Sequence, residues 1–88
     1  MKKNRRPLNP EYDQPAQTTC RNMEDLGRVI RTRRKELGYT QSQIAGAAGI
    51  SQRLMSELER GRGTVAFDTV VDVAMWLGID LIASIRGK

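Results

Sequence analysis

Apolar side chains recur three and four positions apart along most of the chain after residue 22. This spacing places them on one face of an α-helix. Glycines interrupt the pattern, and we expect helices over residues 23–37, 41–48, 52–61 and 67–77. The apolar positions of the first three segments are Leu26, Val29, Ile30, Leu37, Ile44, Ala45, Ala48, Leu54, Met55 and Leu58. The pattern therefore predicts an all-α domain of four short helices.

The fourth segment carries more apolar residues than one buried face needs. The positions expected to face the core are Phe67, Val70, Val71, Ala74 and Leu77. Met75 and Trp76 are then surplus. Two interpretations stand: they pack beneath the C-terminal tail, or they form an interface with another protein, where both residue types are enriched.

The tail IDLIASIRG changes period, because apolar residues now alternate with other residues, as in a β-strand. A lone strand leaves its backbone N–H and C=O groups unpaired, and the sequence shows no second strand. We therefore expect residues 80–88 to form a strand that pairs with a second copy or with another protein. The residues expected at this dimer interface are Leu81, Ile82, Ala83 and Ile85.

Residues 40–61 carry signals that define two helices and the turn between them. Thr40 and Gln43 have the spacing of a capping box, and Ser51 can cap the next helix. Gly49 supplies the positive φ at which the first of the two helices ends. The connection is too short for antiparallel packing, so the helices must cross steeply, as in a helix-turn-helix.

The second helix of this pair has a polar face made by Gln52, Arg53, Ser56 and Arg60. Gln can pair with adenine, Arg with guanine and Ser with either base. A helix that lies in the major groove of DNA needs such residues near its N-terminus. The alternative is an ordinary solvated helix face. The small residues just before the turn favour the DNA interpretation, because they let the two helices approach closely.

The charge distribution agrees with a nucleic-acid partner. The 88 residues carry a net charge of +5, but residues 64–88 alone carry −1. This is expected if the N-terminal arm and the helix-turn-helix face phosphate, and residues 64–88 face protein. Residues 1–21 contain all three prolines and the basic cluster of Lys2, Lys3, Arg5 and Arg6. We expect an extended arm there, which contacts DNA, contacts a partner protein or only adds solubility.

Composition excludes several classes of protein. There is no His and only one Cys, so neither an internal disulfide nor a metal site is expected. The sequence has no glycine-rich phosphate loop and no plausible carboxylate pair, so we expect no enzyme activity and no cofactor. No apolar run reaches membrane-spanning length, and no secretory signal follows the basic N-terminus. We expect a cytoplasmic, nucleoid-associated protein whose small core is supplemented by oligomerisation.

Three runs occur in order: IRTRRKELGYTQSQIAGAAGIS, SELERG and AMWLGI. Through them, residues 27–79 resemble the Cro/C1-type (XRE-family) helix-turn-helix domain. Within that family, the size and the tail resemble the HipB-like antitoxins. The resemblance implies a compact four-helix domain over residues 22–79, with a C-terminal strand that pairs across a dimer. The chain departs from the family at Val65 and Ala66, where a Pro-Ser pair often starts the last helix.

The resemblance also implies roles for single residues. Arg34 would form a structural ion pair with Glu59, near the end of the recognition helix. Gln41 would touch a phosphate and brace Gln52. Together with the polar face, this predicts that Gln52, Arg53 and Ser56 read base edges. The residues expected to hold phosphates are Gln41, Ser51, Arg60 and Arg62.

These inferences predict a homodimeric repressor bound to a palindromic site in double-stranded DNA. The likeness to HipB-like antitoxins implies an antitoxin that autoregulates its operon and binds a HipA-like Ser/Thr kinase toxin. The alternative is a stand-alone repressor without a toxin partner, such as a phage-type or restriction-modification controller.

Overall fold

The computed structural model describes residues 17–62 and 64–87. Its helices are α2 (Met23–Glu36), α3 (Gln41–Ala48), α4 (Gln52–Glu59) and α5 (Phe67–Trp76). The four expected helices are therefore confirmed, with ends that differ only within normal boundary variation. Most of the expected N-terminal arm, including its basic cluster, lies outside the described residues, as does Lys88.

Local capping sets the helix ends. The side chains of Asn22, Thr40 and Ser51 each accept a hydrogen bond from a backbone N–H in the first turn of the helix that follows. Thr40 and Gln43 form the complete capping box, because the Gln43 side chain also accepts from the Thr40 N–H at 2.8 Å. Gly49 ends α3 at φ 73°, a conformation that favours glycine. These short-range bonds explain why the sequence could locate the starts of α2, α3 and α4.

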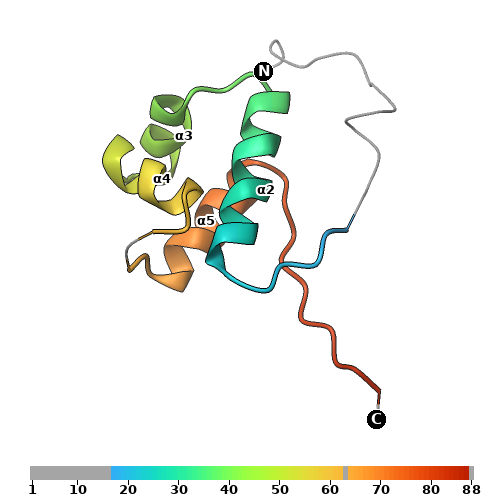
Figure 1. Ribbon diagram of the computed structural model, residues 1–88. Coiled ribbons are helices and arrows are strands. Elements are labelled where there is room, and N and C mark those ends of the chain that lie inside the picture. The colour runs from blue at the N-terminus through green and yellow to red at the C-terminus, as the bar shows by residue number, and fades with distance from the viewer. Residues whose placement is uncertain (1–16, 63, 88) are drawn as a thin grey trace.

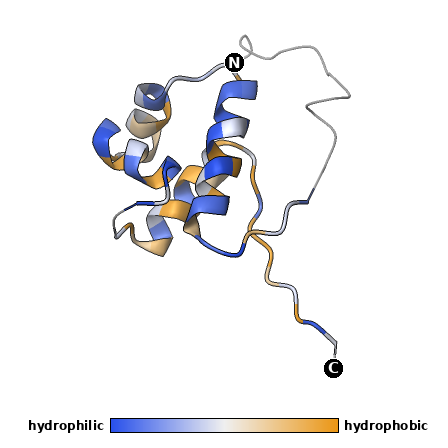
Figure 2. Ribbon diagram, in the orientation of Figure 1, coloured by the Kyte–Doolittle hydropathy of each residue, from blue (hydrophilic) through white to orange (hydrophobic). Residues whose placement is uncertain are grey.

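The core lies between the four helices, and each of them contributes to it. Figure 1 shows α3 and α4 together on one side of α2, with α5 in the middle of the domain. Figure 2 shows apolar and hydrophilic segments following one another along the helices, as amphipathic helices require. The buried apolar residues are Ile30, Ile44, Ala45, Met55, Leu58, Val70, Val73, Ala74 and Leu77.

One expected core position on α5 is wrong. Phe67 is 67% exposed, whereas Val73, which the prediction left out, is fully buried. Val71 is only half-buried. Periodicity indicates which residues share a face, but not how far along the helix the neighbouring elements reach. Phe67 opens α5, and the other helices do not cover that first position.

A glycine lets α2 touch the end of α4. A Cβ atom at Gly27 would lie 2.5 Å from the carbonyl oxygen of Leu58 and 2.6 Å from that of Glu59. Both distances are shorter than a carbon–oxygen contact permits. The position of the last turn of α4 against α2 therefore depends on the missing side chain of Gly27.

The C-terminal tail leaves the helices without forming further secondary structure. Residues 79–87 are neither helical nor paired as a strand in this single chain, and Figure 1 shows the tail running away from the domain. The pairing of residues 80–88 requires a second chain and stays a prediction. Among the described residues, no helix has the length and apolar character needed to cross a membrane.

Candidate nucleic-acid interface

The first turn of α4 presents polar side chains to solvent. Ser51 is the N-cap, with its Oγ accepting from the Leu54 N–H at 3.0 Å, and Gln52 and Arg53 follow it at exposed positions. Ser56, one turn further on, is half-buried. The opposite side of α4 is fixed in the core by Met55 and Leu58. The structure therefore gathers three of the predicted DNA-contacting residues at one end of an anchored helix.

Two other predicted contacts lie at the far end of α4. Arg60 is the C-cap, and Arg62 follows it; both are exposed. The backbone N–H of Arg62 donates to the Glu57 carbonyl at 2.8 Å, which holds this turn against the helix. An eight-residue helix is about 12 Å long, so these cations are separated from the first turn by roughly that length. They form a second group rather than part of the first.

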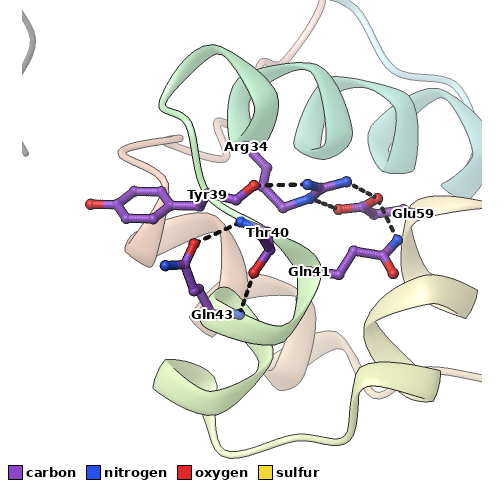
Figure 3. A network of polar contacts seen from close by, with 6 residues as sticks. All are labelled: Arg34, Tyr39, Thr40, Gln41, Gln43 and Glu59. Carbon is purple, nitrogen blue, oxygen red and sulfur yellow. Dashed lines mark hydrogen bonds and ion pairs between the residues drawn. The ribbon is translucent and has the colours of Figure 1, made fainter.

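A buried ion pair joins α2 to the last turn of α4 (Figure 3). Arg34 Nε donates to Glu59 Oε2 at 2.6 Å, and Arg34 Nη2 donates to Oε1 at 3.0 Å. The two side chains are only 8% and 1% exposed. A third guanidinium bond runs from Nη1 to the Tyr39 carbonyl at 2.8 Å. Because the pair is bidentate, it fixes both the distance and the orientation between the two helices.

Arg33, the neighbour of Arg34, binds a different element. Its Nε donates to the Leu77 carbonyl at 3.0 Å, at the C-terminal end of α5. A cation there interacts favourably with the helix dipole and satisfies one of the last carbonyl groups. Two successive side chains of α2 thus bind the ends of α4 and α5.

The side-chain partners of Gln41 and Gln52 differ from those that the resemblance implied. Gln41 Nε2 donates to Glu59 Oε1 at 3.0 Å, so this side chain joins the ion-pair network (Figure 3). Gln52 Oε1 instead accepts a hydrogen bond from Ser42 Oγ at 2.8 Å. The pattern of the sequence had assigned Ser42 no role. A signal was present, because Ser42 is a hydroxyl residue in the first turn of the helix that crosses α4.

Arg53 also has an acidic neighbour, Glu57, that the polar face of the helix did not indicate. Arg53 Nε lies 3.6 Å from Glu57 Oε2, one turn along α4. The Arg53 side chain is 88% exposed, and an exposed pair of this kind contributes about 0.5 kcal/mol or less. Arg53 can therefore leave Glu57 at little cost when a stronger acceptor, such as a guanine edge or a phosphate, is available.

A second exposed surface lies at the end of α5. Met75 is 69% exposed and Trp76 is 53% exposed. The interpretation that they pack beneath the tail is therefore wrong for this chain. Exposed Met and Trp side chains are typical of protein interfaces, which leaves the other interpretation in place.

Comparison with known proteins points to one kind of protein. The family model of the helix-turn-helix domain matches residues 25–81. The uncharacterised HTH-type transcriptional regulator y4mF of Sinorhizobium fredii is 38% identical over 61 residues, which cover 67% of this chain and 80% of that protein. Among solved structures, the clp gene regulator ClgR from C. glutamicum is 36% identical, with a TM-score of 0.62 over 67% of this chain and 76% of ClgR.

Structures of HipB have higher TM-scores but lower sequence identity. A HipB–O2 20mer complex gives a TM-score of 0.73 at 18% identity, over 82% of this chain and 100% of that chain. A HipA–HipB–O2–O3 complex gives 0.71 at 20% identity, over 80% and 99%. Because the sequence identity is this low, the likeness to HipB shows a shared fold and nothing more.

Proposed function

The chain belongs to the XRE-type helix-turn-helix transcriptional regulators, and from this premise we propose that it is a sequence-specific DNA-binding repressor that acts as a homodimer. Each subunit places α4 in a major groove, and the half-sites lie about 34 Å apart along the DNA. One observation carries this proposal: the exposed polar first turn of α4 belongs to a helix that the buried pair of Arg34 and Glu59 fixes in place.

Base reading and phosphate binding fall to different residues. Gln52, Arg53 and Ser56 face base edges, and these contacts give sequence preference. The residues that hold the phosphate backbone are Gln41, Ser51, Arg60 and Arg62. The exposure of the two arginines at the far end of α4 supports their role as cations for the DNA backbone.

The homodimer is proposed from the tail. Leu81, Ile82 and Ile85 are 37%, 65% and 93% exposed, and Ala83 is also exposed. Covering them removes apolar surface from water, and strand pairing satisfies the backbone groups of residues 80–88. A two-fold pair of subunits would recognise a palindromic site in double-stranded DNA.

Within this function, we infer an antitoxin that represses its own operon. The partner is a HipA-like Ser/Thr kinase toxin. The support is the likeness to HipB over nearly its whole chain and the exposed Met75 and Trp76, which lie on α5 rather than on the DNA-reading helix. An interface for a second protein can therefore form while α4 holds DNA.

A stand-alone repressor, of the phage or restriction-modification type, is the second candidate. This candidate is favoured by the sequence identity to the clp gene regulator ClgR, which at 36% is higher than the 18% and 20% found for HipB. In that case Met75 and Trp76 lie in the interface between the two subunits of the homodimer, and no toxin is required.

The DNA-binding proposal is tested with the full chain and a library of random duplexes. After selection, fluorescence anisotropy compares the enriched duplex with a scrambled one. Arg60 and Arg62 of two subunits neutralise about four phosphates, so affinity should fall about a hundredfold between 50 and 200 mM salt. Enrichment of no sequence, or equal affinity for both duplexes, would refute the proposal.

The choice between the two candidates requires the neighbouring gene. The chain is expressed with that gene, and the purified complex is identified by size exclusion and mass spectrometry. A stable complex with a kinase-sized protein supports the antitoxin, and Trp76→Ala should weaken that complex while leaving DNA binding intact. A homodimer that binds DNA alone supports the stand-alone repressor.

A further inference from the structure

The hydrogen bond between Ser42 and Gln52 joins the N-terminal turns of α3 and α4 outside the core. Ser42 Oγ donates to Gln52 Oε1 at 2.8 Å, and both residues are exposed. An exposed bond between two neutral side chains adds little to stability, because water competes for both groups. The folding of the domain therefore gives no strong reason for this contact.

Gln41 is engaged elsewhere. Its Nε2 donates to Glu59 Oε1 at 3.0 Å, and that oxygen belongs to the buried ion pair with Arg34. Moving Gln41 toward Gln52 would take a donor away from a carboxylate that is almost fully buried. Among the described residues, Ser42 is the one whose side chain holds the Gln52 amide through a hydrogen bond.

This bond orients the Gln52 amide. The hydroxyl hydrogen occupies one lone pair of Oε1, which leaves the other lone pair and both Nε2 hydrogens available. A bidentate pair with adenine needs both atoms at once, with Oε1 accepting from N6 and Nε2 donating to N7. An amide without such a partner can rotate or flip, and binding must then restrict it at an entropic cost.

We propose that Ser42 is a positioning residue that sets the base preference of Gln52 by fixing its amide for adenine. The inference rests on the proposed DNA-binding function and adds to it the residue that acts through Gln52. In this proposal Ser42 acts on the base through Gln52.

The test uses four full-length proteins: the wild type and the variants Ser42→Ala, Ser42→Thr and Gln52→Ala. Ser42→Thr is the matched control, because it keeps the hydroxyl. The DNA sequence selected by the wild type is varied one base pair at a time. The position where Gln52→Ala abolishes the preference identifies the base pair that Gln52 reads.

At that base pair, Ser42→Ala should reduce the preference for adenine about three- to tenfold, the equivalent of one hydrogen bond. Ser42→Thr should keep it, and the preferences at the other base pairs should not change. A melting temperature equal to that of the wild type for Ser42→Ala would exclude a general structural effect.

Three results would overturn the inference. In the first, Ser42→Ala keeps the wild-type preference at the Gln52 base pair. In the second, all positions lose preference equally, which indicates a structural role. In the third, the base pair read by Gln52 is not adenine-specific. A wild type that selects no sequence refutes the DNA-binding proposal itself, and the inference with it.

Discussion

Replacement of Glu59 by Ala should destabilise the domain more than any exposed substitution on α4. The change leaves the Arg34 guanidinium buried with only the Tyr39 carbonyl as a remaining partner in this network, and it also removes the acceptor of Gln41. Removing one partner of a buried ion pair costs about 3–5 kcal/mol. A domain of this size has a total stability of only about 3–9 kcal/mol. We therefore expect a melting temperature lower by at least about 12 °C, or a protein that is largely unfolded.

The paired replacement of Arg34 by Met and Glu59 by Leu distinguishes the cost of an unpaired buried charge from the net contribution of the ion pair to stability. It removes both charges and leaves apolar groups of similar volume, a change that is often neutral or stabilising. We expect its stability to lie within about 1 kcal/mol of the wild type. The cost of Glu59→Ala thus comes from the charge left behind on Arg34, rather than from a large net contribution of the pair.

Urea unfolding followed by far-UV circular dichroism gives the free energies for this comparison. Glu57→Ala is the matched control, because Glu57 lies on the same helix but pairs with Arg53 at the surface, and its removal should cost about 0.5 kcal/mol or less. If Glu59→Ala costs no more than this control, the buried pair does not hold α4. If the paired replacement is as unstable as Glu59→Ala alone, an uncompensated charge is not the cause.

Further substitutions test the packing, the DNA contacts and the dimer. Gly27→Ala should cost about 2 kcal/mol or more in urea unfolding, because its Cβ overlaps two carbonyl groups of α4. Gly46→Ala, in open space within α3, should instead stabilise by about 0.5–1 kcal/mol, and equal costs would contradict the close approach of α2 and α4. Arg53→Ala should weaken binding to the selected DNA by about 1–3 kcal/mol and relax one base preference; equal weakening on random DNA would show that Arg53 binds phosphate. Arg62→Ala should lower the slope of log affinity against log salt by about 1 for each phosphate that Arg62 neutralises, and an unchanged slope would remove it from the interface. Deletion of residues 80–88 should give monomers in analytical ultracentrifugation, and an unchanged dimer would refute strand pairing.

How far the sequence predicts this fold depends on the range of each interaction. The N-caps at Asn22, Thr40 and Ser51 act within one turn of their own helix, so the starts of these three helices followed directly from the sequence. The pairing of Arg34 with Glu59 joins residues far apart in the chain, and only the family resemblance suggested it. The exposure of Phe67 depends on where the neighbouring helices end, and the apolar spacing within α5 gives no information about that.

The candidate site was predicted in outline but not in its internal contacts. The polar composition of α4 identified Gln52 and Arg53 from the sequence. The choice of Ser42 rather than Gln41 as the partner of Gln52 depends on the orientation of three side chains at the crossing of two helices. The strand proposed for the tail is a further case, because its backbone partners would belong to another chain.

The adjacent positions of Arg33 and Arg34 bear on the spacing of a DNA site. One side chain holds the end of α5, where the tail begins, and the other holds the end of α4. The orientation of the end of α5 relative to the end of α4 is therefore set within one turn of α2. In a tail-paired dimer, a change of about 5° in that orientation would move each recognition helix by roughly 1.5 Å, taking half of the ~34 Å half-site spacing as the lever. That is nearly half of the ~3.4 Å rise of one base pair. A dimer built in this way would tolerate little insertion or deletion between its half-sites.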